Sequence, residues 1–229
     1  MSLVSALFTA TIGLGALLLF WLQPMFAKMT LPLLGGAPAV WSTALVFFQA
    51  TLLAGYVYAH LSLRWLGPRR QSLCHLGLVL LAVLALPVAV AEGWTPPAET
   101  PPVPWLLALL AVSTGLPFFA LAATAPLLQA WLWASGQAAG GDPYRLYAAS
   151  NLGSLLALVG YPLLLEPLFG LRGQSWLWSA GYLVFLALMV AVAVLLWRGT
   201  GRAPPRPRSS DIRCHGVRGP GRVCVETTN

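Results

Sequence analysis

The chain has 229 residues, of which 58% are hydrophobic and 8% are charged. An average soluble domain carries about 25% charged residues, so a water-soluble fold of this size could not cover so much apolar side chain. The chain is therefore predicted to be a membrane protein in contact with a lipid bilayer. Most of the formal net charge of +7 comes from the last 32 residues, where seven Arg outnumber two acids, so the charge does not predict a nucleic-acid-binding domain.

The first apolar segment, residues 3–23, contains no charge and is long enough to cross about 30 Å of hydrocarbon. It lacks the basic start and the short apolar core of a cleaved signal peptide, so we expect a retained first crossing. Residues 23–41 follow, and their three prolines and two glycines predict a turn at the membrane edge instead of one continuous helix. Lys28 in this turn is either a snorkelling lysine or a cation that faces a cavity and pairs with an acid.

Three more apolar segments follow this turn. Residues 40–63 and 73–91 predict the second and third crossings, and the loop 92–104 has two acids and five prolines, which predicts a stiff, extended connection. The fourth segment, residues 105–134, is longer than one crossing requires. Its internal Thr, Gly and Pro residues predict a kinked or broken helix.

The fifth segment, residues 144–164, follows Asp142, which can cap a helix, and a proline at the first helical position. It carries a row of small residues that predicts a helix-packing seam: Ala149, Ser150, Gly153, Ser154 and Ala157. The sixth segment spans residues 175–197. The sequence therefore predicts an all-α integral membrane fold, with a six-helix transmembrane bundle over residues 1–198 and a basic Arg/Pro/Gly-rich tail over residues 199–229.

The distribution of positive charge predicts the orientation of this bundle. The second connection carries three arginines, the fourth carries Arg145 and the tail carries seven, and all of these fall on one side. Because Lys and Arg concentrate on the cytoplasmic side, both termini are predicted to be cytoplasmic. All ten tryptophans lie at or near a predicted helix end, as expected for rings at the membrane interface.

Residue patterns typical of catalysis are nearly absent. The three histidines, His60, His75 and His215, lack metal-ligand spacing, and each is read as a lone polar residue. No glycine-rich loop lies between a strand and a helix, and the three scattered cysteines argue against a disulfide framework. We expect no enzyme activity, cofactor or metal site, and we expect binding or transport instead.

Polar residues near the membrane segments form a candidate site for transport or packing: Lys28, Gln49, Gln129, Asn151, Glu166 and Arg172. Lys28 and Glu166 belong to the same predicted membrane edge, and we hypothesise that they pair; the alternative is two separately solvated charges. Asn151 lies inside the fifth crossing, where an unpaired amide costs free energy. We therefore expect it to face the bundle, in a hydrogen bond between helices or in contact with a substrate.

Residues 5–197 resemble the membrane region of bacterial fused transporter/spermidine-synthase-like proteins in three blocks: QPMFAKMTLPLLGGAPAVW, FFQATLLAGYVYAHL and DPYRLYAASNLGSLLALVGYPLLLEPLFGLRGQSWLW. The resemblance implies a helical region like one half of a major-facilitator transporter, located in a bacterial inner membrane. It also implies a polyamine or a related small cation as substrate. The segment HLSLRWLGPRR is similar to the basic cytoplasmic motif of major-facilitator transporters but lacks its Asp. The matching positions are Arg64, Gly67, Arg69 and Arg70.

The soluble synthase-like domain of that family has no counterpart in this sequence. After Trp197 the chain becomes rich in Arg, Pro and Gly, which predicts either a disordered basic tail or a frameshifted reading of a longer protein. Two functions remain open. The chain is either a transporter-like module, which with six helices needs a homodimer or a partner membrane half, or a non-transporting anchor or scaffold for a soluble synthase-like domain.

Overall fold

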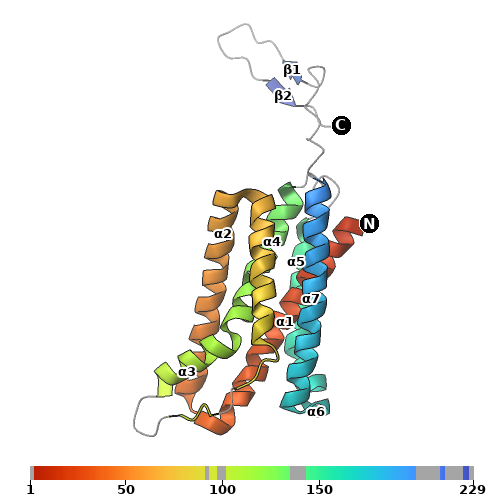
Figure 1. The fold of residues 1–229 in the computed structure, drawn as a ribbon. Helices are drawn as coiled ribbons and strands as arrows, with labels where there is room; N and C mark the ends of the chain where they lie inside the picture. Colours follow the sequence, from red (N-terminus) through yellow and green to blue (C-terminus); the bar gives the residue numbers. More distant parts are fainter. Residues whose placement is uncertain are drawn as a thin grey trace.

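The structure is a computed structural model that describes residues 3–90, 93–96, 102–134, 143–199, 212–214 and 224–226. Long helices lie side by side in one bundle (Figure 1). In chain order the helical elements are α1 (Leu3–Leu34), α2 (Pro38–Ala82), the 3-10 turn η1 (Val83–Ala85), α3 (Pro102–Leu110), the π-helical segment η2 (Ala111–Gly115), α4 (Leu116–Ala134), α5 (Pro143–Gly160), the π-helical segment η4 (Tyr161–Leu165), α6 (Glu166–Leu168) and α7 (Leu171–Gly199).

Two short strands are described in the tail, β1 (Ile212–Cys214) and β2 (Cys224–Glu226). They pair antiparallel, with Cys214 opposite Cys224. The rest of the tail, to which the disorder and frameshift interpretations apply, lies outside the described residues. So do Asp142 and part of the loop 92–104, namely residues 92 and 97–101.

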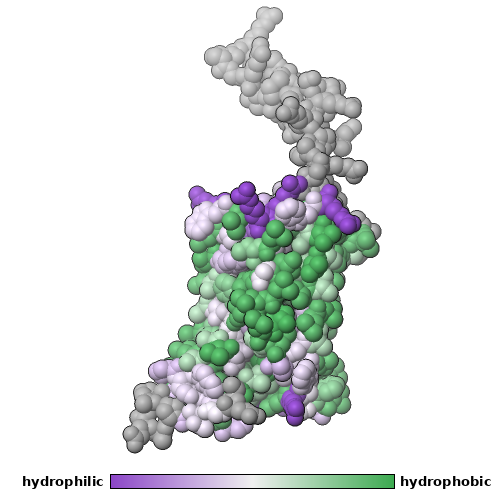
Figure 2. Space-filling view, in the orientation of Figure 1, coloured by the Kyte–Doolittle hydropathy of each residue, from purple (hydrophilic) through white to green (hydrophobic). Residues whose placement is uncertain are grey.

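Five of the helical stretches in the described part are long and apolar enough to cross a membrane: Leu3–Leu34, Pro38–Ala85, Pro102–Ala134, Tyr144–Leu168 and Leu171–Arg198. A crossing needs about 20 residues, which each stretch provides. Figure 2 shows, on the face in view, a hydrophobic band between a hydrophilic upper rim and hydrophilic residues near the lower end. The five described stretches are thus, as the composition predicts, long and apolar enough to span a membrane.

α2 is not a straight rod, because it folds back on itself at Gly67 (Figure 1). Gly67 has φ 68° and ψ 168°, a region of backbone conformation that is essentially restricted to glycine. In a continuous helix Tyr58 and His75 would be about 25 Å apart. Their ring centroids are instead 6.0 Å apart, and Gln71 Nε2 donates to Ser62 Oγ at 3.2 Å. α2 is therefore a hairpin with two helical arms, residues 38–66 and 68–82.

The predicted turn over residues 23–41 is wrong for most of its length. α1 continues through Pro24 and Pro32 to Leu34, and only the next three residues form the turn. A proline removes one backbone hydrogen bond, and a helix that is held on several sides tolerates that loss. Met25 and Phe26 in this stretch are fully buried in the core.

Two other predicted boundaries also change. The third crossing was expected to reach residue 91, but its helical stretch ends at Ala85 and residues 86–90 are non-helical. The carbonyl of Val88 in that stretch accepts a hydrogen bond from Ser175 Oγ on α7. The sixth segment begins at Leu171, four residues before the predicted start at 175, with Gln174 Nε2 donating to the Phe169 carbonyl at 2.8 Å.

The predicted interruption of the fourth segment is confirmed, but its form is different. The chain is helical from Pro102 to Ala134, and the irregular part is the π-helical segment η2, not a break at Pro117 or Pro126. α1 packs against α4, α5 and α7, while α2 packs against α3, α4 and α7. α4 is therefore in contact with both α1 and the α2 hairpin.

Candidate functional site

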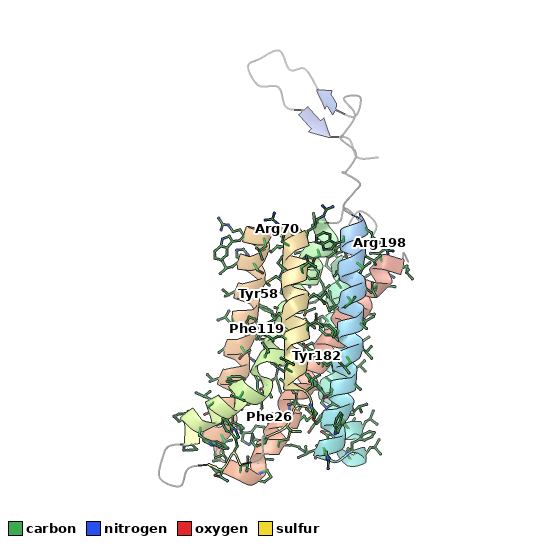
Figure 3. All side chains as sticks on the ribbon, viewed as in Figure 1. Phe26, Tyr58, Arg70, Phe119, Tyr182 and Arg198 are labelled. Carbon is green, nitrogen blue, oxygen red and sulfur yellow. The ribbon has the colours of Figure 1, made fainter. Side chains whose placement is uncertain are left out.

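Charged side chains lie at the two ends of the bundle. Arg64, Arg69 and Arg70 surround the fold-back of α2, Arg145 lies in the first turn of α5 and Arg198 lies at the end of α7. All of these positions are at the upper end, where Figure 3 labels Arg70 and Arg198. The structure thus gathers at one end five of the arginines that the sequence assigns to one side of the membrane, and the side chains of the other tail arginines lie outside the described part.

An ion pair lies at the lower end. Lys28 Nζ contacts Glu166 Oε1, joining α1 to the start of α6, and the two side chains are 31% and 43% exposed. Lys28 Nζ also lies 5.9 Å from the centroid of the Tyr161 ring, within the range of a cation–π interaction. The hypothesis that Lys28 and Glu166 pair is confirmed, although Lys28 lies within a helix and not in a turn.

The structure does not bring the other candidate residues together. Gln49, Gln129, Asn151 and Arg172 are all exposed and belong to different helices. The expectation that Asn151 faces the bundle is wrong. α5 turns Gly153 toward α1, and Asn151, two residues earlier, lies about 200° away around the helix.

A small cavity, here called the central cleft, lies between α1, the first arm of α2, α4 and α5. It has a volume of about 120 Å³. Its polar side chains are Tyr56, Thr124 and Ser150. The rest of its lining is apolar: Ile12, Gly15, Ala16, Leu19, Phe20, Leu52, Leu121, Ala122 and Ala125. None of its lining residues carries a charge.

A larger groove of about 670 Å³ lies along α1 and α5, but its lining offers no polar side chain except the indole of Trp21. The indole nitrogen of Trp21 is buried without a hydrogen-bond partner among the described residues. A groove lined by Leu, Val, Ala and Gly matches a lipid chain, which the bilayer supplies everywhere. The central cleft is therefore the better candidate for selective binding.

A buried polar cluster lies behind the central cleft. His75, on the second arm of α2, is fully buried, and its Nε2 is 3.0 Å from Thr124 Oγ1 on α4. The ring of Trp131 lies edge-on to His75, with centroids 6.1 Å apart. Tyr58, on the first arm of the hairpin, donates to Cys74 Sγ on the second arm at 3.7 Å (Figure 3 labels Tyr58).

Sequence reasoning missed this cluster because it treated His75 as a lone polar residue. A signal was present, since Gln71 and His75 are four residues apart and share one face of a helix. Both are completely buried in the structure. Thr124, the partner of His75, is 49 residues further along the chain and could not be identified from local spacing.

Three atoms of this cluster lack a hydrogen-bond partner among the described residues: His75 Nδ1, Gln71 Oε1 and Trp131 Nε1. Buried polar atoms usually have partners, because an unsatisfied one loses its hydration without compensation. Within the same described part, no three His, Cys, Asp or Glu residues lie close enough together to hold a metal ion.

No family model, no curated protein and no solved structure matches the chain. The resemblance to fused transporter/spermidine-synthase-like proteins therefore remains a prediction from the quoted sequence blocks.

Proposed function

We propose that the chain is a bacterial inner-membrane protein with six crossings. The two arms of the α2 hairpin count as two crossings, and they join those made by α1, by α3 with α4, by α5 with η4 and α6, and by α7. The fold-back at Gly67 supports this count, because it divides one apolar stretch of 48 residues into two antiparallel arms. The first arm exceeds the length of about 20 residues that a crossing requires, and the second arm together with η1 approaches it.

The position of the arginines supports an orientation with both termini in the cytoplasm. Five arginines lie at the upper end of the bundle, together with the N-terminus and the end of α7 (Figure 1). Positive residues are retained on the cytoplasmic side during insertion. Gly93 belongs to the connection at the opposite end.

A topology map tests this arrangement. Reporter tags placed after Gly93 and at the C-terminus are expected to lie on opposite sides of the membrane, with the C-terminal tag in the cytoplasm. A fluorescent protein that folds only in the cytoplasm and an alkaline phosphatase that is active only outside it give paired readouts. Two tags on the same side would contradict the six-crossing arrangement.

We propose further that this bundle is one half of a transporter for a small molecule. The observation that carries the proposal is the central cleft, where Tyr56, Thr124 and Ser150 lie among apolar residues of four different helices. Binding pockets within bundles are lined in this way, with few polar groups that fix the orientation of the ligand. The π-helical segments η2 and η4 add irregular backbone, which often marks functional positions.

A second membrane half, supplied by another copy of this chain or by a separate protein, would complete the pathway. Gln49 lies within the first arm of α2 and Asn151 within α5, and both side chains are exposed in a single copy. A polar side chain at membrane depth usually faces protein or a water-filled cavity, since lipid offers it no hydrogen bond. These two residues therefore favour a protein partner against the exposed faces of α2 and α5.

Flux through proteoliposomes tests the transport proposal. The full chain is reconstituted into proteoliposomes. One set of proteoliposomes is loaded with the labelled diamine 1,4-diaminobutane, the type of substrate that the sequence resemblance implies, and a parallel set is loaded with its uncharged analogue 1,4-butanediol. Ala125→Phe, which fills the central cleft, is expected to abolish protein-dependent flux, whereas Ala54→Phe on an exposed face of α2 should leave it unchanged. Absence of protein-dependent flux would favour the anchor or scaffold function.

A further inference from the structure

The hydrogen bonds of Thr124 determine what the central cleft can bind. Thr124 Oγ1 donates to the Ala120 carbonyl at 2.8 Å, within α4. A hydroxyl has one hydrogen, so this bond uses its only donor. The contact of 3.0 Å with His75 Nε2 must then run in the other direction, with the imidazole donating to Thr124 Oγ1.

This arrangement assigns the tautomer of His75. Nε2 carries the hydrogen, and Nδ1 carries a lone pair that has no partner among the described residues. The groups that face the imidazole from neighbouring elements are the rings of Tyr58 and Trp131, and neither is a charged side chain. His75 is therefore a neutral donor that holds the Thr124 hydroxyl in place.

Thr124 consequently acts as an acceptor toward the cleft that it lines. A hydroxyl oxygen has two lone pairs, and His75 occupies one of them. Because Thr124 is almost fully buried, a ligand can reach its second lone pair only from the cleft, and that ligand must supply a hydrogen of its own. Because both other bonds of Thr124 are made to buried groups, the hydroxyl cannot rotate to become a donor without breaking one of them.

Among the described residues, the helices that line the cleft carry no acidic side chain. The sequence has no Asp or Glu in residues 3–85, 102–134 or 143–165, so none lies in the helices that line the cleft. Asp142, directly before α5, lies outside the described residues, and Glu166, which follows η4, is paired with Lys28 at the lower end of the bundle. A buried cation needs an opposite charge to offset its lost hydration, and the cleft does not supply one.

We propose that the central cleft binds a small uncharged molecule that donates a hydrogen bond to Thr124, with His75 as the positioning residue for that hydroxyl; this rests on the proposed use of the cleft for transport. The volume of about 120 Å³ limits the ligand to a few heavy atoms, since drug-sized pockets are several times larger. A polyamine dication has the donors but also a charge that the site does not balance. Selection against the cation follows from the absence of a carboxylate.

Two probes of equal length separate these alternatives. 1,4-Butanediol and 1,4-diaminobutane share a four-carbon chain, and at neutral pH the first is uncharged while the second is a dication. Saturation-transfer NMR with the full chain in lipid nanodiscs, corrected with empty nanodiscs, measures weak binding of both. We expect saturable binding of the diol and a diamine signal at the level of the empty nanodiscs.

Variants locate the site and test the role of His75. Thr124→Val is expected to weaken diol binding about tenfold, as the loss of one hydrogen bond predicts. Thr43→Val is the matched control, since Thr43 Oγ1 makes the same kind of intrahelical bond, to the Ala39 carbonyl, and does not line the cleft. His75→Phe should weaken binding by a smaller factor. His75→Gln, whose amide nitrogen can replace Nε2 as donor, should restore diol binding. If the ring of His75 had only a structural role, the Gln variant would not restore binding.

The proposal is overturned if the diol does not bind, if the diamine binds as tightly as the diol, or if Thr124→Val binds the diol like the unmodified chain while retaining its thermal unfolding temperature. Its failure differs from failure of the transport proposal. Diol binding without flux contradicts transport alone, whereas flux of the diamine without diol binding contradicts the neutral-ligand proposal alone.

Discussion

Gly153→Ala is expected to destabilise the folded bundle strongly. A Cβ atom at position 153 would overlap the carbonyl oxygen of Gly13 and lie 3.0 Å from its carbonyl carbon and 3.2 Å from the Leu17 nitrogen. These are backbone atoms of α1, so no side chain can rotate away to make room. α1 and α5 would have to separate along their whole contact, at a cost of about 3 kcal/mol, the upper part of the usual range for overpacking.

The measurement is the thermal unfolding of purified protein in detergent, together with the fraction that elutes as a single species. Gly77→Ala is the matched control, because a Cβ there meets nothing within 4 Å. That substitution exchanges a poor helix former for a good one and should be neutral or stabilising by up to about 1 kcal/mol. Equal unfolding temperatures for Gly153→Ala and the unmodified chain would show that α5 does not pack on α1 as described.

The small-residue seam of α5 illustrates what the sequence can predict for this fold. Small residues at Gly153 and Ala157 predict close contact with another helix. That contact is present where Gly153 lies against Gly13 of α1. Pairing of specific helices is not encoded locally, so the sequence does not predict that α5 and α1 are the partners.

The burial of individual residues in these helices is harder to predict, since a crossing is apolar on both its lipid side and its protein side. On α5, Leu155 and Leu156 are exposed while Ala157 is buried. The same ambiguity affects the aromatic residues. Trp133 is 71% exposed, as an interfacial ring would be, whereas Trp131 and Trp178 are completely buried in the bundle although they too lie near helix ends.

The candidate site shows a related division. The pairing of Lys28 with Glu166 could be predicted, because two opposite charges near the same edge of an apolar bundle have few other partners. The contact of His75 with Thr124 could not, since it depends on the fold-back of α2 and on the packing of that hairpin against α4. Asn151 does not face the bundle, because α5 leaves one side uncovered and polar residues face the interior only where a helix is surrounded.

Reversal of the charge at one end of the Lys28–Glu166 pair is expected to destabilise the bundle, and reversal at both ends to restore most of the loss. Lys28→Glu places two carboxylates together, and Glu166→Lys places two ammonium groups together. Each single change removes an attraction and adds a repulsion between side chains that are only partly exposed. We expect each to cost about 2 kcal/mol, with the size limited by solvent screening.

The double variant should remain less stable than the unmodified chain, because the pair is not symmetric. Lys28 Nζ lies 5.9 Å from the centre of the Tyr161 ring, whose face is electron-rich and attracts a cation. A carboxylate at position 28 would face that ring without attraction, so the deficit should be about 0.5–1 kcal/mol. Unfolding temperatures of the four proteins at low and high salt give the coupling energy, with Arg172→Glu, an exposed cation at the same end, as the control. A double variant that is as unstable as the sum of the two single changes would show that the ion pair does not hold α1 against α6.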